Sequence, residues 1–306
     1  MTITEAELSG RTFGCELEYE GITQEKAAKT VAKVLGGVAR YEGNHLSNWT
    51  VAMADGRKWN IVRDGSLYGG AEVVTPILRY TDMATLQEVV RALRKAGAKA
   101  NSRTGLHVHV GIADFNATNV KNLVKTWFKQ ETLILKAIGT LPERLGHYTR
   151  PTDRTFVDKI CGLRNPTMDA INRAWFGTYT PNPAHYDGHR YRTLNINNLW
   201  GYGAKKTMEI RAFNGTTHAG EVRTAVELSL LLAIRAKNAK ASSAKNPRPY
   251  SEASAKYDFR VFLLRLGANG ATFKTMRKHL CKNLPGSAAW KDGRHDGRNA
   301  RAEANG

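Results

Sequence analysis

The segment TGLHVHVG at residues 104–111 alternates between two kinds of side chain. His107 and His109 occupy every second position, and apolar residues lie between them. Because successive side chains of a β-strand point to opposite faces, the alternation predicts a strand with one apolar face and two imidazoles on the other. Two surface histidines on an edge strand would give the same pattern, so other segments have to decide between these interpretations.

Further strand-like segments carry acidic groups on one face. These groups are Glu16 and Glu18 in segment 11–21, Glu72 in segment 71–78 with Asp64 eight residues before it, and Glu209 in segment 206–215. Carboxylates packed together repel and raise one another's pKa unless cations lie among them. Oxygen-rich ligands with an occasional histidine favour Mg²⁺ or Mn²⁺, whereas a zinc site prefers more histidine or cysteine. The pattern therefore predicts a magnesium or manganese site.

Arginine and asparagine accompany the last of these carboxylates. Arg211 shares a strand face with Glu209, and Arg192, Asn195 and Asn197 come from a strand expected at 192–199. A guanidinium beside metal-binding carboxylates suits phosphoryl transfer, because it stabilises charge on the moving phosphoryl group. For Arg211 taken alone, an ion pair joining two strands is the simpler alternative.

The order of strands and helices indicates the fold class. Helices are expected at 23–37, 81–97, 117–138 and 219–238, and a hairpin at the Asp55-Gly56 turn. Because no regular βαβ alternation appears, we expect an α+β fold. A largely antiparallel sheet would form a cleft for metal and ATP, with helices packed on its other face. Neither of the common glycine-rich phosphate loops occurs, so a bound nucleotide would use other groups.

Composition divides the chain into three regions. We expect a catalytic domain at 1–239, a linker at 240–256, and a basic, partly helical region at 257–306 with a disordered tail. The net charge is +19, and residues 240–306 alone hold 14 basic and 5 acidic side chains. This region is expected either to contact nucleic acid or another polyanion, or to act only as a solubilising tail.

The remaining composition points to a cytoplasmic location. The three cysteines are widely spaced, and the N-terminal segment lacks both the basic start and the apolar stretch of a secretory signal. No apolar run approaches the ~18 residues of a membrane span. The segment 142–190 is expected to be loop-rich and to supply substrate or nucleotide contacts. Arg144, Arg150 and Arg154 are candidate anion contacts there, although each of them taken alone is more simply explained as a solvated loop charge.

An ordered set of motifs resembles the amidoligase family, within the carboxylate–amine ligase superfamily that includes glutamine synthetase and glutamate–cysteine ligase. The motifs are FGCELEY, RDGSLYGGAEVVTP, TGLHVHV, RTLNIN and MEIRAFNGT, and they lie between residues 12 and 218. GLHVHV resembles the metal-histidine strand of glutamine synthetase. MEIR resembles its metal-glutamate and catalytic-arginine strand. The resemblance implies a glutamine synthetase catalytic-domain-like fold.

The resemblance also implies roles for individual residues. Glu16, His107 and Glu209 would hold the metal nearest the transferred phosphoryl group, and Glu18, Glu72 and Asp64 would hold a second metal. The division of Glu16 and Glu18 between the two ions stays open, and the short arm of Asp64 makes its role the weakest of these. Arg211 and Arg192, with Glu209, would be catalytic. His109 would orient His107 or a substrate. Asn195 and Asn197, together with His109, would contact the nucleotide.

The implied reaction is ATP-dependent ligation with Mg²⁺ or Mn²⁺. A carboxylate would take the γ-phosphoryl group of ATP, and an amine would then displace phosphate from the acyl phosphate to form an amide. The partners would be small-molecule or peptide acids and amines, with no membrane contact.

Two rival interpretations remain. A histidine pair on a strand is also typical of HUH endonucleases, which nick single-stranded DNA with a tyrosine on a facing helix. The helix expected at 117–138 has no tyrosine, and this interpretation leaves the strand carboxylates unexplained. A non-catalytic nucleic-acid-binding protein would explain the charge but not the carboxylates.

Overall fold

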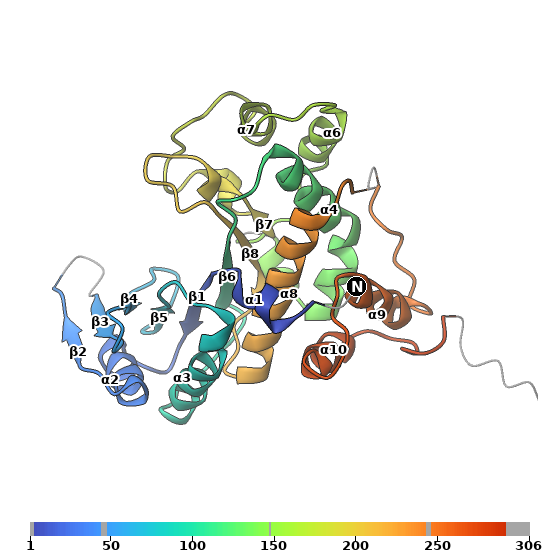
Figure 1. The fold of residues 1–306 in the computed structure, drawn as a ribbon. Coiled ribbons are helices and arrows are strands. Elements are labelled where there is room, and N and C mark those ends of the chain that lie inside the picture. Colours follow the sequence, from blue (N-terminus) through green and yellow to red (C-terminus); the bar gives the residue numbers. More distant parts are fainter. Residues whose placement is uncertain (1–2, 44–47, 147, 243–245, 292–306) are drawn as a thin grey trace, which may run out of the picture.

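A single curved sheet organises the molecule. The computed structural model describes residues 3–43, 48–146, 148–242 and 246–291. Within these residues the strands form one sheet in the order β2-β3-β4-β5-β1-β6-β8-β7, with every neighbouring pair antiparallel (Figure 1). The strands are β1 (Phe13–Tyr19), β2 (Ala39–Tyr41), β3 (Trp49–Ala52), β4 (Lys58–Val62), β5 (Ala71–Val74), β6 (Gly105–Gly111), β7 (Leu194–Asn195) and β8 (Thr207–Asn214). The expected α+β fold with a largely antiparallel sheet is confirmed.

Several helices cover one face of this sheet. The α-helices of the described residues are α1 (Glu5–Ser9), α2 (Gln24–Leu35), α3 (Met83–Lys95), α4 (Ala117–Ile138), α5 (Pro142–Gly146), α6 (Arg154–Gly162), α7 (Met168–Phe176), α8 (Ala219–Asn238), α9 (Ala255–Arg265) and α10 (Lys274–Cys281). Short 3-10 helices lie at Tyr80–Asp82, Gly188–Arg190 and Asn197–Leu199. The helix α8 packs on β6, and α2 packs on β3 and β4 (Figure 1). No described helix has the length and apolar character that a membrane span requires.

Alternation along the central strands separates a core face from a polar face. Leu106, Val108 and Val110 of β6 are buried against the helices, as the sequence predicts. The antiparallel register then brings polar side chains together on the other face. Glu16 lies opposite His107, Glu18 opposite Glu72, and His109 opposite Glu209. Strands far apart in the chain thus contribute to one polar surface.

The register between β6 and β8 shifts at His107. Leu106 pairs with Phe213, whereas Val108 pairs with Ile210. One residue of β6 therefore faces two residues of β8, which is a β-bulge. Such bulges bend a strand locally and redirect its side chains, and this one lies in the middle of the polar face.

Two expected segments differ from the structure. The strand expected at 192–199 is reduced to β7 and a 3-10 helix at Asn197–Leu199. The segment 142–190, expected to be loop-rich, contains α5, α6 and α7. Each of α6 and α7 begins at a polar N-cap, Asp153 and Thr167, and buries a short apolar face. Their length of nine residues is too short for periodicity to stand out among prolines and arginines.

The C-terminal helices pack on the rest of the chain. Phe259 of α9 and Met276 of α10 belong to the same hydrophobic core as the sheet and α8. Part of the segment 240–256 runs along α4, where Arg248 N donates to Lys129 O at 2.8 Å. The expected disordered tail, GRHDGRNARAEANG at 293–306, lies outside the described residues. The division into three regions stays a prediction.

Candidate active site

A polar cleft of about 480 Å³ opens over the central strands. One wall carries the carboxylates of β1, β5 and the loop after β4, with His107 on its floor. The other wall is basic and aromatic. The cleft is lined by Glu16, Glu18, Val62, Arg63, Asp64, Gly65, Ser66, Glu72, Arg103, His107, Arg144, Tyr148, His185, Tyr186, Arg190, Tyr191 and Arg211.

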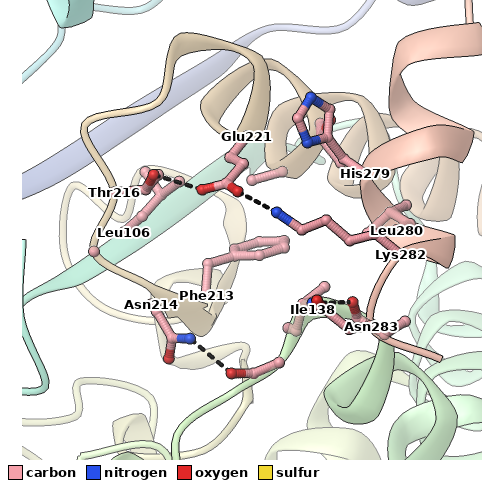
Figure 2. A pocket seen from close by; sticks show the side chains of 15 residues that line it. Leu106, Ile138, Phe213, Asn214, Thr216, Glu221, His279, Leu280, Lys282 and Asn283 are labelled. Carbon is pink, nitrogen blue, oxygen red and sulfur yellow. Dashed lines mark hydrogen bonds and ion pairs between the residues drawn. The ribbon is translucent and has the colours of Figure 1, made fainter.

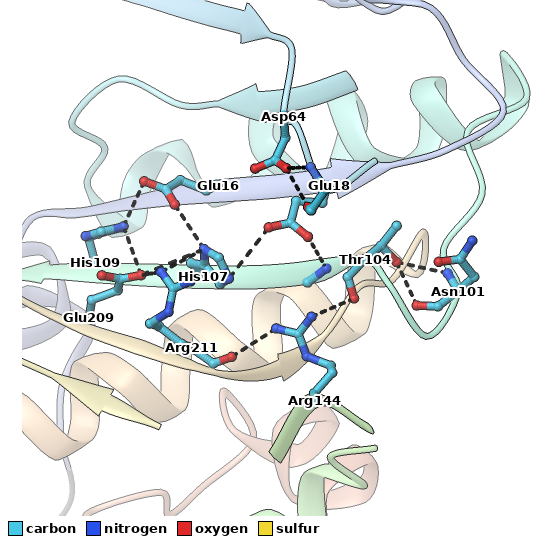
Figure 3. A network of polar contacts seen from close by, with 12 residues as sticks. Glu16, Glu18, Asp64, Asn101, Thr104, His107, His109, Arg144, Glu209 and Arg211 are labelled. Carbon is cyan, nitrogen blue, oxygen red and sulfur yellow. Dashed lines mark hydrogen bonds and ion pairs between the residues drawn. The ribbon is translucent and has the colours of Figure 1, made fainter. Parts of the chain in front are cut away.

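Glu16, His109 and Glu209 form the first compact group. One ligand atom from each lies within 4.8 Å of the others. The His109 Nε2 atom is 3.1 Å from Glu16 Oε1 and 3.9 Å from Glu209 Oε1 (Figure 3). The three side chains come from the adjacent strands β1, β6 and β8, so the sheet itself sets their spacing. Two carboxylates and one imidazole suit Mn²⁺ or Mg²⁺.

Glu18, Asp64 and Glu72 form the second compact group, also within 4.8 Å of one another. Glu18 and Glu72 are paired across β1 and β5. Asp64 reaches them from the loop after β4, where its Oδ1 accepts a hydrogen bond from Ser66 N at 2.6 Å. The short arm of Asp64 is therefore compensated by the position of its loop. An all-carboxylate set favours a hard divalent cation.

His107 lies between the two groups. Its Nδ1 atom is 3.0 Å from Glu16 Oε2, and its Nε2 atom is 3.7 Å from Glu18 Oε1 (Figure 3). The sequence prediction assigned the ligand role to His107 and an orienting role to His109. In the structure it is His109 that completes the first group, while His107 bridges both. The assignment of these two roles stays a prediction.

Crowding of the carboxylates changes their proton affinity. Burial, reinforced by the charges of Glu16, Glu18 and Asp64, raises the pKa of Glu72 to about 9. Burial also tends to raise the pKa of Glu16, but His109 and His107 outweigh it and hold that pKa well below its ordinary value. The excess of negative charge therefore collects around Glu72. A divalent cation would offset it, so the donor set fits the expected metal.

Arg211 lies on the same face beside Glu209. Its Nη1 atom donates to Glu209 Oε1 at 2.5 Å, and Asn195 Nδ2 donates to Glu209 Oε2 at 2.7 Å. Both Arg211 and Glu209 are buried. Burial tends to lower the pKa of Arg211, but Glu209 outweighs it and raises that pKa, so the guanidinium stays charged. A fixed cation beside carboxylates can stabilise an anion that enters the cleft.

Arg192 and Asn197 are placed differently. Arg192 donates to Pro151 O at 3.0 Å and contacts Asp153, and it lines a separate small cavity rather than the cleft. The Asn197 side chain accepts from Trp175 Nε1 at 2.6 Å, and its backbone N donates to Asn195 Oδ1 at 2.8 Å. Asn197 therefore holds Asn195 in place. The roles predicted for Arg192 and Asn197 stay predictions.

The basic wall contains residues that the motifs did not single out. Arg103 lies over the Tyr68 ring at 4.5 Å, and Arg190 lies over the Tyr186 ring at 5.7 Å. For Arg190 and Tyr186 the sequence signal was the abundance of arginine and tyrosine in 142–190, which gave no positions, and Arg103 lies outside that segment. Arg144, one of the arginines already considered as an anion contact, is buried at the bottom of this wall.

A second cavity of about 330 Å³ lies on the helix side of the sheet, between β8, α8 and α10 (Figure 2). Glu221 accepts hydrogen bonds there from Lys282 Nζ and Thr216 Oγ1, each at 2.6 Å. Its carboxylate is thus paired, and none of the metal-ligand groups of the described residues lies in this cavity. The candidate active site is therefore the cleft.

A family model described as "Putative amidoligase enzyme" matches residues 9–233, which include every residue of both compact groups. The chain belongs to the amidoligase family. This membership supports a ligase that joins a carboxylate to an amine. A comparison with curated proteins found no match.

A solved structure also resembles the chain. It is the complex between the prokaryotic ubiquitin-like protein Pup and its ligase PafA, with a TM-score of 0.39 and 8% sequence identity. The match covers 90% of this amidoligase chain and 63% of the solved chain.

Proposed function

We propose that the protein is an ATP-dependent ligase that forms an amide bond through an acyl phosphate. One observation carries this proposal: two compact carboxylate groups flank His107 and lie beside the fixed cation Arg211 on one polar face. Phosphoryl transfer needs cations around the transferred group and a positioned guanidinium. The two groups supply ligands for the cations, and Arg211 supplies the guanidinium. Family membership supports the amide-forming half of the reaction.

The residues that would hold the cations are those of the two groups. Glu16, Glu209 and an imidazole would hold one ion, and Glu18, Asp64 and Glu72 would hold the other. When bound, Mg²⁺ or Mn²⁺ supplies charge neutralisation for the triphosphate. Asn195 orients the Glu209 carboxylate by its hydrogen bond, so that the ligand oxygens keep their direction.

The reaction would proceed in two covalent steps. An oxygen of the acid attacks the γ-phosphorus of ATP, the bond to the β-γ bridging oxygen breaks, and ADP leaves. The amine nitrogen then attacks the carbonyl carbon of the acyl phosphate, phosphate leaves, and the nitrogen loses a proton. Arg211 stabilises the negative charge of the phosphoryl group in both steps.

The supporting experiment measures ADP release by the purified protein with Mn²⁺ and a panel of acids and amines. We expect turnover that requires one acid and one amine together, and that falls by at least about 100-fold in Glu209→Ala. Arg91 is an exposed residue of α3, so Arg91→Ala is the matched control and should leave turnover unchanged. Absence of both Mn²⁺ binding and nucleotide binding in the unsubstituted protein would reject the proposal.

The endonuclease alternative requires one separate test, because Tyr148 and His107 line the same cleft. Incubation with single-stranded DNA and Mn²⁺ should leave no covalent tyrosyl–DNA adduct. An adduct that disappears in Tyr148→Phe would favour the alternative.

We place the reaction in the cytoplasm, and the three free cysteines support this location.

A further inference from the structure

Arg144 joins two strands at the bottom of the cleft. It belongs to the short helix α5, and its guanidinium is buried, with the residue only 3% exposed. Nη1 donates to Thr104 O at 3.1 Å, and Nη2 donates to Arg211 O at 3.2 Å (Figure 3). One side chain thus contacts the start of β6 and the residue of β8 that carries the proposed catalytic cation.

The Arg211 carbonyl depends on this contact. The Arg211 N–H donates to Thr193 O at 2.9 Å. In a regular antiparallel pair the Thr193 N–H would donate back to the Arg211 carbonyl, but it donates to Arg150 O instead. The strand β7 begins only at Leu194, and the β6–β8 bulge lies beside the same residue. A buried carbonyl needs a donor, and here Arg144 provides it.

Gly105 makes the close approach of Arg144 to β6 possible. A Cβ atom at residue 105 would lie 2.5 Å from Nη2 and 2.8 Å from Nη1 of Arg144, so the guanidinium rests on the glycine. The Gly105 N–H in turn donates to Glu18 Oε2 at 2.6 Å. Arg144 therefore packs on the backbone that donates to a carboxylate of the second group, and its charge is close enough to interact with the charge of Glu18.

We propose that Arg144 is a positioning residue that holds the backbones of Arg211 and Gly105 and so places the phosphoryl-binding guanidinium, while its charge partly compensates that of Glu18. This inference rests on the proposed function, because that function gives Arg211 and Glu18 their roles. It also predicts an electrostatic effect. Loss of the Arg144 charge leaves Glu18 less compensated, which strengthens cation binding, while misplacement of Arg211 weakens nucleotide binding.

The test compares Arg144→Gln and Arg144→Lys with a matched control. Arg277 of α10 also donates to two backbone carbonyls, those of Ala268 and Gly270, but it lies outside the cleft. Arg277→Gln therefore removes the same kind of contact elsewhere. Hydrogen exchange by mass spectrometry reports the backbone, and calorimetry reports the affinity for Mn²⁺ alone and for a non-hydrolysable ATP analogue at saturating Mn²⁺.

We expect faster exchange at 104–108 and 208–213 in both Arg144 variants and unchanged exchange there in Arg277→Gln. In Arg144→Gln, affinity for the ATP analogue should fall about tenfold or more, since a charged hydrogen bond is lost, while affinity for Mn²⁺ should rise. Arg144→Lys keeps the charge, so its Mn²⁺ affinity should stay unchanged while its nucleotide affinity falls.

Three results would overturn the proposal. The first is unchanged exchange at both segments, and the second is an equal effect in Arg277→Gln. The third is a parallel loss of both affinities in Arg144→Gln, because that would indicate general loosening of the fold. If the unsubstituted protein binds neither Mn²⁺ nor nucleotide, the proposed function fails, and the exchange data still decide whether Arg144 holds the two backbones. If Arg144→Gln does not fold, Arg144→Lys still tests the proposal, through faster exchange at both segments and a fall in nucleotide affinity at unchanged Mn²⁺ affinity.

Discussion

At the residue scale, the two imidazoles of β6 divide the polar face between them. His109 contacts only the first group, through Glu16 and Glu209, whereas His107 contacts Glu18 of the second group as well. A side chain that touches one group should affect one cation, and a side chain that bridges both should affect two. The number of cations that each substitution affects therefore tests which role each histidine has.

We expect His109→Asn to lower the affinity for one of two Mn²⁺ ions by about 10- to 100-fold and to leave the affinity for the other unchanged. We expect His107→Asn to lower the affinity for both ions. Titration of Mn²⁺ by calorimetry or by electron paramagnetic resonance measures each affinity. Loss of a single ion in His107→Asn together with normal binding in His109→Asn would restore the ligand role to His107.

Gly105 gives a second prediction at this scale. Gly105→Ala places a methyl group against the Arg144 guanidinium, which cannot move without giving up two buried hydrogen bonds. We expect a loss of about 1–3 kcal/mol in the free energy of unfolding. Urea denaturation measures it. Gly146→Ala, where no atom lies within 4 Å of the added Cβ, is the control and should differ little from the unsubstituted protein.

At the scale of elements, long periodic segments were predictable and short ones were not. The helix at 117–138 agrees with the predicted bounds, because its apolar stripe continues for 22 residues. The strands β1, β5, β6 and β8 were found from alternation, and with them most of the two carboxylate groups. The placement of Arg144 depends instead on how the chain runs between α4 and β7, and local periodicity does not encode that path.

Contacts between elements also set a pH dependence. Glu227 of α8 is fully buried and accepts hydrogen bonds from Tyr80 Oη and Arg223 Nε, each at 2.7 Å. Burial raises the pKa of Glu227 more than these two partners lower it. The folded state therefore binds this proton more tightly than the unfolded state, so the stabilisation is complete below about pH 4.3 and is lost as pH rises through the raised pKa.

Glu227→Gln stays neutral and should lack this dependence. We expect the free energy of unfolding of the unsubstituted protein, relative to that of Glu227→Gln, to fall as pH rises from about 4 to about 8. Urea denaturation at several pH values measures the difference. A difference that is constant or grows with pH would show that the ionised carboxylate is the form that the fold favours.

At the scale of the whole molecule, part of the charge excess lies in a C-terminal segment that contains two helices. Residues 292–306 carry three basic and three acidic side chains, so they add no net charge. The excess of the C-terminal region therefore lies in 240–291, which includes α9 and α10. Lys274 and Lys278 are both exposed and one helical turn apart on α10, so they present charge from one face of that helix. A polyanion would meet this face rather than the end of the chain.

We expect a chain that ends at residue 291 to keep its retention on heparin, because the deleted residues carry no net charge. The double variant Lys274→Glu and Lys278→Glu should elute at lower salt, and the slope of log affinity for duplex DNA against log salt should decrease by about 2. Fluorescence anisotropy across a salt series measures that slope, and ADP release checks that the cleft is intact.

Retention that disappears on deletion of 292–306 but survives the double variant would move the contact to the tail. Unchanged retention in both would mean that the charge of this region serves solubility rather than a nucleic-acid partner.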